Sequence, residues 1–211
     1  VLAVSIFCLA SYSYYLNKEI LNLSNLVYFK FVSILMSFIA LEISFLSDDF
    51  SVLYVASNSN PFLPIYYKFS ALWGGHEGSM LLFILILSLW IVLFSLSTNY
   101  QSVRDKNYLH GFTSLIFLSF AGFTIFTSNP FERLLPISPL NGTDLNPLLQ
   151  DFAFTIHPPM LYLGYAGLVI PFAIALGRCI GVMEAWALRI KKWTTLAWSF
   201  LTLGIALGLS L

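Results

Sequence analysis

The chain has 211 residues, of which 58% are hydrophobic and only 9% are charged. About a quarter of the residues in a soluble globular domain are charged, so this composition excludes that class and predicts an integral membrane protein. The formal net charge is +0, so bulk charge indicates no nucleic-acid partner, and we expect membrane lipid to surround the chain.

Six apolar windows approach the length of about 20 residues that a membrane span needs. They are 1–16, 26–46, 79–97, 109–127, 160–177 and 193–211. Because unpaired backbone is costly in lipid and these runs are apolar on every face, we predict helices and not a barrel. The predicted fold class is all-α, a polytopic membrane protein of about six transmembrane helices that form a single membrane domain over residues 1–211.

The connections between these windows alternate in positive charge. Lys68 and Arg133 lie in the second and fourth connections, and the other eight of the ten Lys and Arg residues lie in or beside the first, third and fifth. Positively charged loops remain on the cytoplasmic or matrix side. We therefore expect the two long connections, about 47–78 and 128–159, to face outward.

The second connection ends in an unusual run of residues. Ile65–Trp73 is aromatic and amphipathic, which suits the membrane interface. After Trp73, two glycines allow a sharp turn, and His76 and Glu77 come just before the third window. These two side chains are either a polar pair that closes the loop, with Glu77 at a helix start, or a pair of ligand or catalytic groups.

Single residues inside or beside the windows also carry predictions. We expect His110, near the inner end of the fourth window, to be a solvated interface histidine. Glu42, near the outer end of the second window, is either a functional or paired acid or simply reaches the outer surface. Pro171 predicts a kink in the fifth window. Gly204 and Gly208 have GxxxG spacing, which predicts a close-packing face.

The stretch Asp144–Tyr165 contains the histidine with the most specific surroundings. A polar loop leads into His157, and the two prolines that follow are expected to hold it out of the helical region, at the start of the fifth helix. A neutral imidazole binds haem iron through one nitrogen, while its second N–H needs an acceptor. Asp144, Asp151 and the loop carbonyls are the candidate acceptors.

On the residues alone, two interpretations of His157 stay open. It is either an axial ligand to haem iron or a helix-start histidine bonded to its own loop. Tyr162 and Tyr165 lie near the same outer end and could flank a flat aromatic ring. The chain has no CxxC motif and no second histidine near this one, which excludes a closed zinc site, whereas haem needs only one ligand from the chain.

Several sequence runs resemble one family, in the same order along the chain. They are VASNSN (Val55–Asn60), WGGHEGS (Trp73–Ser79), TSNPF (Thr127–Phe131), LNPLLQD (Leu145–Asp151) and HPPMLYLGY (His157–Tyr165). Together they are similar to the CcmF family, the haem lyases of bacterial and mitochondrial cytochrome c maturation. The superfamily also includes the nitrite-reductase haem lyase and CcmC. We expect the chain to be the amino-terminal part of a larger haem lyase, ending before the tryptophan-rich motif of the family.

The resemblance implies a function and a set of partners. The family receives haem from the CcmE-type chaperone and joins its vinyl groups to the CxxCH thiols of apocytochrome c, which a CcmH-type partner helps to present. The histidine of the family's HPP motif matches His157, so the resemblance implies that His157 is an axial ligand to haem iron. It also implies haem b as the cofactor and the bacterial inner membrane, or alternatively the mitochondrial inner membrane, as the location.

Two other functions stay open on the residues. A multi-pass transporter would use the outer loops as a gate and Glu42 as a coupling site, although the chain shows no inverted repeat and no pair of broken helices. A structural subunit would use Asp144–Ile156 only to dock partners, without haem. We expect part of a lyase to be inactive on its own, so the residues leave open whether this chain is an enzyme.

Overall fold

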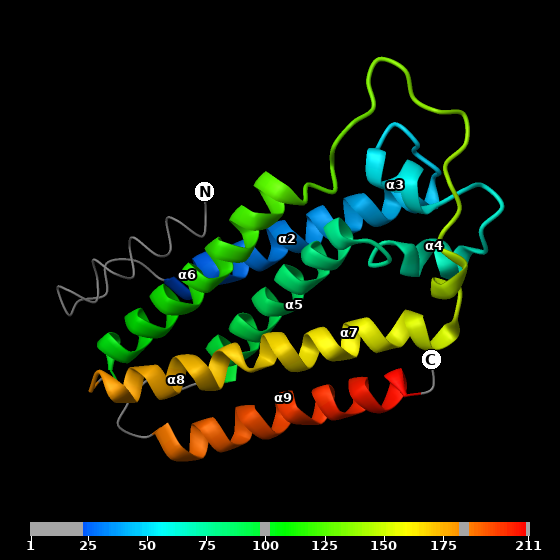
Figure 1. Ribbon diagram of the computed structural model, residues 1–211. Coiled ribbons are helices and arrows are strands. Elements are labelled where there is room, and N and C mark those ends of the chain that lie inside the picture. The colour runs from blue at the N-terminus through cyan, green and yellow to red at the C-terminus, as the bar shows by residue number, and fades with distance from the viewer. Residues whose placement is uncertain (1–22, 98–101, 182–185, 210–211) are drawn as a thin grey trace.

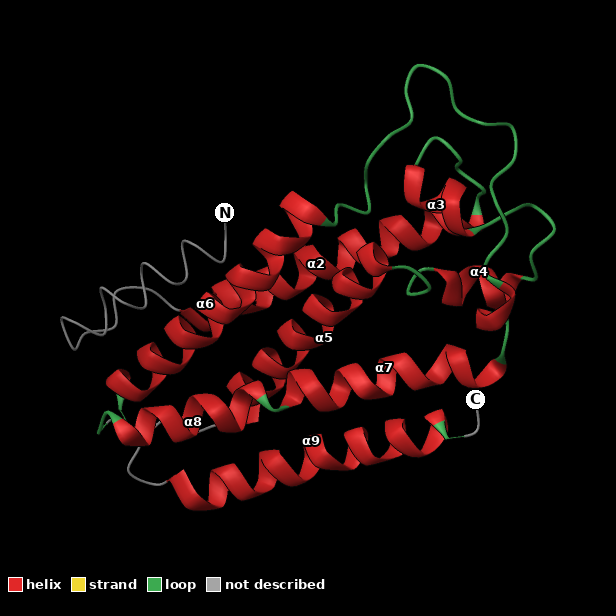
Figure 2. Ribbon diagram, viewed as in Figure 1, coloured by secondary structure: helices red, strands yellow, loops and turns green. Residues whose placement is uncertain are grey.

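The computed structural model describes residues 23–97, 102–181 and 186–209, which form helices joined by loops and contain no named strand (Figure 2). In chain order the elements are α2 (Leu23–Leu46), α3 (Leu53–Asn58), α4 (Ile65–Ala71), α5 (His76–Ser97), α6 (Val103–Thr127), the 3₁₀ turn η1 (Pro147–Leu149), α7 (Phe152–Gly167), α8 (Val169–Cys179) and α9 (Trp186–Gly208). The predicted all-α class is confirmed, and the window 1–16 lies outside the described residues.

Four helical segments in the described part of the chain are long and apolar enough to cross a membrane. They are Asn25–Leu46, His76–Ser97, Val103–Thr127 and Phe152–Cys179. They match the second to fifth predicted windows and confirm a polytopic membrane protein. The sixth window forms most of α9, which has 23 residues but is not among these four. Its first two turns carry Arg189, Lys191 and Lys192, which lower its hydropathy, so the predicted count of six is not confirmed.

The central helix of the bundle is α5, which lies between α2 and α7 (Figure 1). After Glu77 it has no charged residue, and 67% of its apolar window is buried, compared with 22% for α2. A helix that is apolar on every side can be buried on every side. Trp90 of α5 is 2% exposed, and its indole N–H donates to the Leu163 carbonyl of α7 at 3.0 Å. This bond satisfies the polar edge of a buried aromatic ring.

The helices α7 and α8 form one nearly continuous segment with a break at Leu168. Pro171 has no N–H to give to the carbonyl of Gly167, so the regular bonding of the helix is interrupted there. Pro171, where the sequence predicts a kink, lies three residues after this break. α9 then runs back along α7 in the opposite direction (Figure 1).

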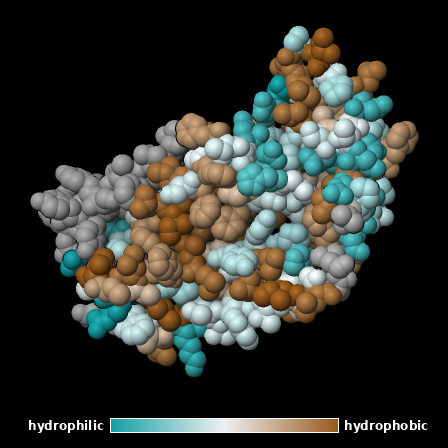
Figure 3. Space-filling view, viewed as in Figure 1, coloured by the Kyte–Doolittle hydropathy of each residue, from teal (hydrophilic) through white to brown (hydrophobic). Residues whose placement is uncertain are grey.

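The two long connections meet at one end of the bundle, which we call the loop end (residues 47–75 and 128–151; Figure 1). Backbone hydrogen bonds join them, from Leu53 N to Glu132 O at 2.8 Å and from Thr143 N to Ala56 O at 2.7 Å. Hydrophilic residues gather over this end, whereas hydrophobic residues predominate over the helices on the same face of the molecule (Figure 3). The two connections, which the sequence predicts to lie on the same side of the membrane, therefore pack against each other at one end of the bundle.

Two ion pairs stabilise the loop end. The ammonium of Lys68 lies 2.6 Å from the carboxylate of Asp48, and the lysine side chain is only 9% exposed. Asp48 itself has a φ of 54°, in the left-handed region that Asp tolerates better than most residues. Arg133 lies 3.0 Å from Asp49, with 51% and 35% of the two side chains exposed. The first pair is partly shielded from water, and the second is open to it.

Candidate functional site

The helix that carries His157 begins earlier than the sequence predicts. Asp151 is the N-cap of α7, and its carboxylate accepts a hydrogen bond from Ala153 N at 2.7 Å. This is the usual way in which a short polar side chain starts a helix. His157 therefore lies in the second turn of α7, with Pro158 and Pro159 inside the helix. The prediction that the prolines hold His157 out of the helical region is wrong.

The two prolines remove only two helical hydrogen bonds. Without their N–H groups, the carbonyls of Phe154 and Thr155 lose the donors that lie four residues ahead. Helices in membrane proteins tolerate such losses because neighbouring groups or water replace the bonds. The cap at Asp151 has already fixed the direction of the helix, so the chain continues through the proline pair.

The ring of His157 faces α9. Its Nδ1 atom lies 2.7 Å from the carbonyl oxygen of Gly204. A Cβ atom added at Gly208 would lie 2.6 Å from Cε1 of the same ring, so α9 packs against the imidazole with no space for a side chain there. Of the predicted acceptors, Asp151 caps α7 and Asp144 is exposed in its loop. The prediction that His157 bonds to either acid or to its own loop is wrong.

The contact with Gly204 decides which nitrogen of His157 carries the proton. A carbonyl oxygen can only accept, so Nδ1 must donate its proton to it. Nε2 of the neutral ring then keeps its lone pair, and it makes no hydrogen bond with any residue in the described part of the chain. An N–H that is fixed by a carbonyl, with a free second nitrogen, is the arrangement found in metal-ligating histidines.

The two tyrosines predicted beside His157 lie about 60° apart on the same side of α7, and both are turned away from the direction of the imidazole. At about 100° per residue, Tyr162 is roughly 140° around α7 from His157, and its ring packs edge-on against Phe83 of α5. Tyr165 is roughly 80° around the helix and 57% exposed. Tyr165 is therefore closer than Tyr162 to the direction of the imidazole, about two turns further along.

The run WGGHEGS forms the turn into α5 around a buried tyrosine of α3. The hydroxyl of Tyr54 donates to Leu72 O at 2.8 Å and accepts from Gly75 N at 2.9 Å. Burial raises the pKa of this hydroxyl above its usual value, the Gly75 N–H opposes that rise, and the nearby charge of Glu77 adds to it. Tyr54 therefore stays neutral and connects α3 to the turn.

His76 and Glu77 form the first turn of α5, where the sequence places them just before the helix. His76 is exposed, and its ring meets Phe123 of α6 edge-on at 5.7 Å. Trp73 is 6% exposed, and its indole N–H has no hydrogen-bond partner in the described structure. The three residues therefore face different surroundings and do not converge with His157.

A polar cavity of about 190 Å³ lies at the loop end, between α3, the start of α5 and the segment after α6. We call it the loop-end pocket. Its polar lining includes Asn58, Glu77, Ser128, Asn129 and Glu132. The sequence analysis did not predict it, although the runs VASNSN, WGGHEGS and TSNPF each contribute to its lining. Folding brings these three runs together from distant parts of the chain.

Comparisons with known proteins agree on one family. The profile described as cytochrome C assembly protein matches residues 73–210. The chain belongs to this family. The CcmF protein of Pseudomonas aeruginosa is 48% identical over 85% of this chain and 28% of that protein. The NrfE protein of Haemophilus influenzae is 43% identical over 80% of the chain and 27% of its own length.

A solved structure named cytochrome c heme lyase CcmF has the same fold as this chain. It has a TM-score of 0.78 and 25% sequence identity, over 96% of this chain and 32% of that one. The predicted resemblance to the CcmF family is therefore confirmed. The chain spans less than a third of the length of the relatives it matches.

Two further polar residues of this chain lie inside the bundle. Glu42 of α2 is 9% exposed, and neither of its carboxylate oxygens has a hydrogen-bond partner in the described residues. His110 of α6 is 2% exposed. The predictions that Glu42 could simply reach the surface and that His110 is solvated are both wrong, because packing between helices covers both side chains. Lys30 of α2 is also buried, with its ammonium 4.4 Å from the ring centre of Phe117.

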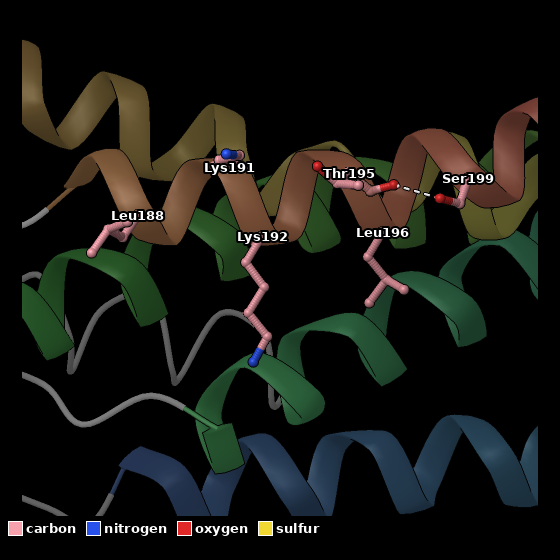
Figure 4. Close-up of a pocket in the computed structure, with 6 residues that line it drawn as sticks. All are labelled: Leu188, Lys191, Lys192, Thr195, Leu196 and Ser199. Carbon is pink, nitrogen blue, oxygen red and sulfur yellow. Dashed lines mark hydrogen bonds between the residues drawn. The ribbon is translucent and has the colours of Figure 1, made fainter.

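A second cavity is an open apolar groove of about 480 Å³ on α9. Figure 4 shows Lys192 and Leu196 extending from the same side of α9, and the Ser199 hydroxyl bonded to the Thr195 carbonyl. All of its described lining residues belong to this one helix, and none is an acid or a histidine. Its described lining therefore offers no carboxylate or imidazole to bind a metal ion.

Proposed function

We propose that this chain positions haem during cytochrome c biogenesis, with His157 as an axial ligand of the haem iron. The observation that carries the proposal is the hydrogen bond between Nδ1 of His157 and the carbonyl of Gly204. It orients the ring and keeps the proton on Nδ1, so that Nε2 can bind iron. Membership of the cytochrome C assembly protein family supports the same function.

The residues around His157 have separate parts in this proposal. Gly208 packs against the ring and limits its rotation, and the exposed Tyr165 is available to flank a porphyrin. Tyr162 contributes indirectly, by anchoring α7 to α5 through Phe83. Bound haem would supply the vinyl groups, and the chain would supply only position and ligation. Haem b is the form that we propose.

The loop end is the proposed site of contact with partners. We propose that it faces the periplasm, in a bacterial inner membrane, because the basic residues gather at the other end. A CcmE-type chaperone would deliver haem there, and a CcmH-type partner would present the thiols of apocytochrome c. His76 and Asp144 are exposed at this end and available to such partners, whereas Trp73 is buried beneath it.

The proposal is tested by substituting His157 in the full-length protein. We expect His157→Ala to abolish haem retention and cytochrome c assembly, because no other described histidine lies against α9. His157→Met should keep some haem but change its absorption spectrum, because a thioether is a weaker ligand. Haem content and assembled cytochrome c are measured in membranes with matched protein levels.

The matched control is His76→Ala, which removes an exposed histidine from the same end of the molecule. It should leave the haem spectrum unchanged. If His157→Ala retains haem with an unaltered spectrum, the ligand role is wrong. An equal loss in both variants would show that the effect is not specific to His157, and it would also contradict the proposal.

A further inference from the structure

The open groove on α9 combines basic and apolar side chains on one helix. Its described lining residues are Leu188, Lys191, Lys192, Thr195, Leu196 and Ser199, and we call this surface the α9 groove. Figure 4 shows Leu188, Lys192 and Leu196 extending from the same side of the helix, so Lys192 lies between two leucines, one turn away on either side. The volume of the groove, about 480 Å³, is in the usual range for ligand sites.

The polar side chains at the basic end of the groove are donors without acceptors. Neither Lys191 nor Lys192 forms an ion pair or a hydrogen bond with any described residue, and the ammonium of Lys192 lies 5.9 Å from the ring centre of Trp193. The Thr195 hydroxyl also makes no hydrogen bond with the described part of the chain. The sequence of α9 contains no acidic residue. An anion that only accepts hydrogen bonds therefore complements this end of the groove.

The position of the groove indicates that the anion belongs to a lipid. α9 packs along α7, which is part of the candidate membrane span Phe152–Cys179. Lys191 and Thr195 lie roughly 160° around α9 from the buried Trp193, so the groove is turned away from the bundle. Trp186 begins α9 and is 38% exposed, as is typical of tryptophans at the boundary between membrane and water. The lysines follow within two turns, from where long basic side chains extend to the lipid headgroups.

We propose that the α9 groove binds an anionic phospholipid. The phosphate accepts hydrogen bonds from the ammonium groups of Lys191 and Lys192 and from the Thr195 hydroxyl, and an acyl chain lies along Leu196. Anionic lipids gather in the cytoplasmic leaflet, which is the side that we propose for the basic end.

The lipid would act on the helix that orients His157. α9 carries the Gly204 carbonyl, which lies 2.7 Å from Nδ1 of that histidine. A lipid held at the first turns of α9 would fix the depth and rotation of this helix in the membrane. Binding of the lipid does not depend on a haem ligand, so its test succeeds or fails whatever His157 binds.

The first test measures the thermal midpoint of the wild-type, full-length protein in a non-ionic detergent, so it does not depend on how variants fold. Three probes are titrated. Dioleoyl phosphatidylglycerol is anionic, dioleoyl phosphatidylcholine has the same acyl chains without net charge, and inorganic phosphate has no acyl chain. We expect only phosphatidylglycerol to raise the midpoint substantially.

Three outcomes of this titration overturn the proposal. An equal response to the two lipids would show that the headgroup charge is not recognised. A response to inorganic phosphate as large as that to phosphatidylglycerol would assign the lysines to a free anion. No response to any probe is the result expected if another protein segment covers the groove.

The second test compares the apparent affinity of three variants for phosphatidylglycerol. Lys191→Gln and Lys192→Gln should each weaken binding by about fivefold, the contribution of one basic residue at an anionic membrane surface. Arg178→Gln is the matched control, because Arg178 is exposed at the same end of the molecule but is not among the described lining residues. It should keep the wild-type affinity. An equal loss in all three variants would indicate general attraction to positive charge and would overturn the proposal.

Discussion

Asp48 and Asp49 are adjacent in sequence, yet their ion pairs differ in burial. Asp48→Asn leaves the ammonium of Lys68 shielded and uncompensated, so we expect it to lower the free energy of unfolding by about 3 kcal/mol. Asn tolerates the left-handed backbone at this position, so the change is confined to the charge. Asp49→Asn breaks an exposed pair and should cost about 0–1 kcal/mol.

Thermal unfolding of the two variants in the same detergent provides the comparison. If both variants lose the same free energy of unfolding, the burial of Lys68 has no energetic consequence. That result would contradict the expected difference between the two ion pairs.

The sequence predicted His157 as a site residue, but it did not predict the hydrogen-bond partner of this histidine, the Gly204 carbonyl. Its acceptor is 47 residues further along the chain, on a different helix. Periodicity and proline rules describe only neighbours in sequence, and they favoured an acceptor in the adjacent loop. The loop-end pocket was hidden for the same reason, because a pocket formed by three separate segments has no local signal.

The helices α7 and α9 pack closely through their glycines. A Cβ atom added at Gly164 would lie 2.7 Å from the backbone of Leu201, which cannot move away as a flexible side chain can. We expect Gly164→Ala to force the two helices apart and to cost about 1–3 kcal/mol. Gly122→Ala in α6 is the control, because a Cβ there meets nothing within 4 Å.

The control should be neutral or should stabilise by up to about 1 kcal/mol, since alanine is the better helix former. The free energies of unfolding of both variants are measured in detergent. If Gly164→Ala unfolds at the same temperature as Gly122→Ala, the close contact of α7 with α9 is not a feature of the protein.

Helix starts were harder to predict than helix spans. Hydrophobic runs placed four of the six windows on helical membrane spans, because burial in lipid depends on length and apolar content. The start of α7 depends on Asp151, a single capping side chain outside the apolar run, and the hydrophobic window begins nine residues after it. Capping is a local interaction that a hydropathy count does not register.

The whole molecule has two chemically different ends. The loop end carries both long connections, and the opposite end carries Arg178 and the basic first turns of α9. The positive-inside rule predicts that a membrane-impermeant maleimide added to intact spheroplasts labels Leu140→Cys, a loop-end residue that is 94% exposed. Cys179, which is exposed at the basic end, should react only after lysis.

For this experiment Cys8 is replaced by serine in both proteins, and Cys179 is also replaced by serine in the Leu140→Cys protein, so that each protein carries a single thiol. Labelling of Cys179 in intact cells, with protection of the Leu140→Cys thiol, would reverse the orientation.

The bond between His157 and Gly204 has a consequence for the order of events during synthesis. The imidazole lies on α7, but the carbonyl that fixes its tautomer belongs to α9, the last helix of the described chain to leave the ribosome. Until α9 has inserted, the ring can rotate and carry its proton on either nitrogen. In a nascent chain, the orientation of the His157 ring and the nitrogen that carries its proton would therefore be fixed only after α9 packs against α7.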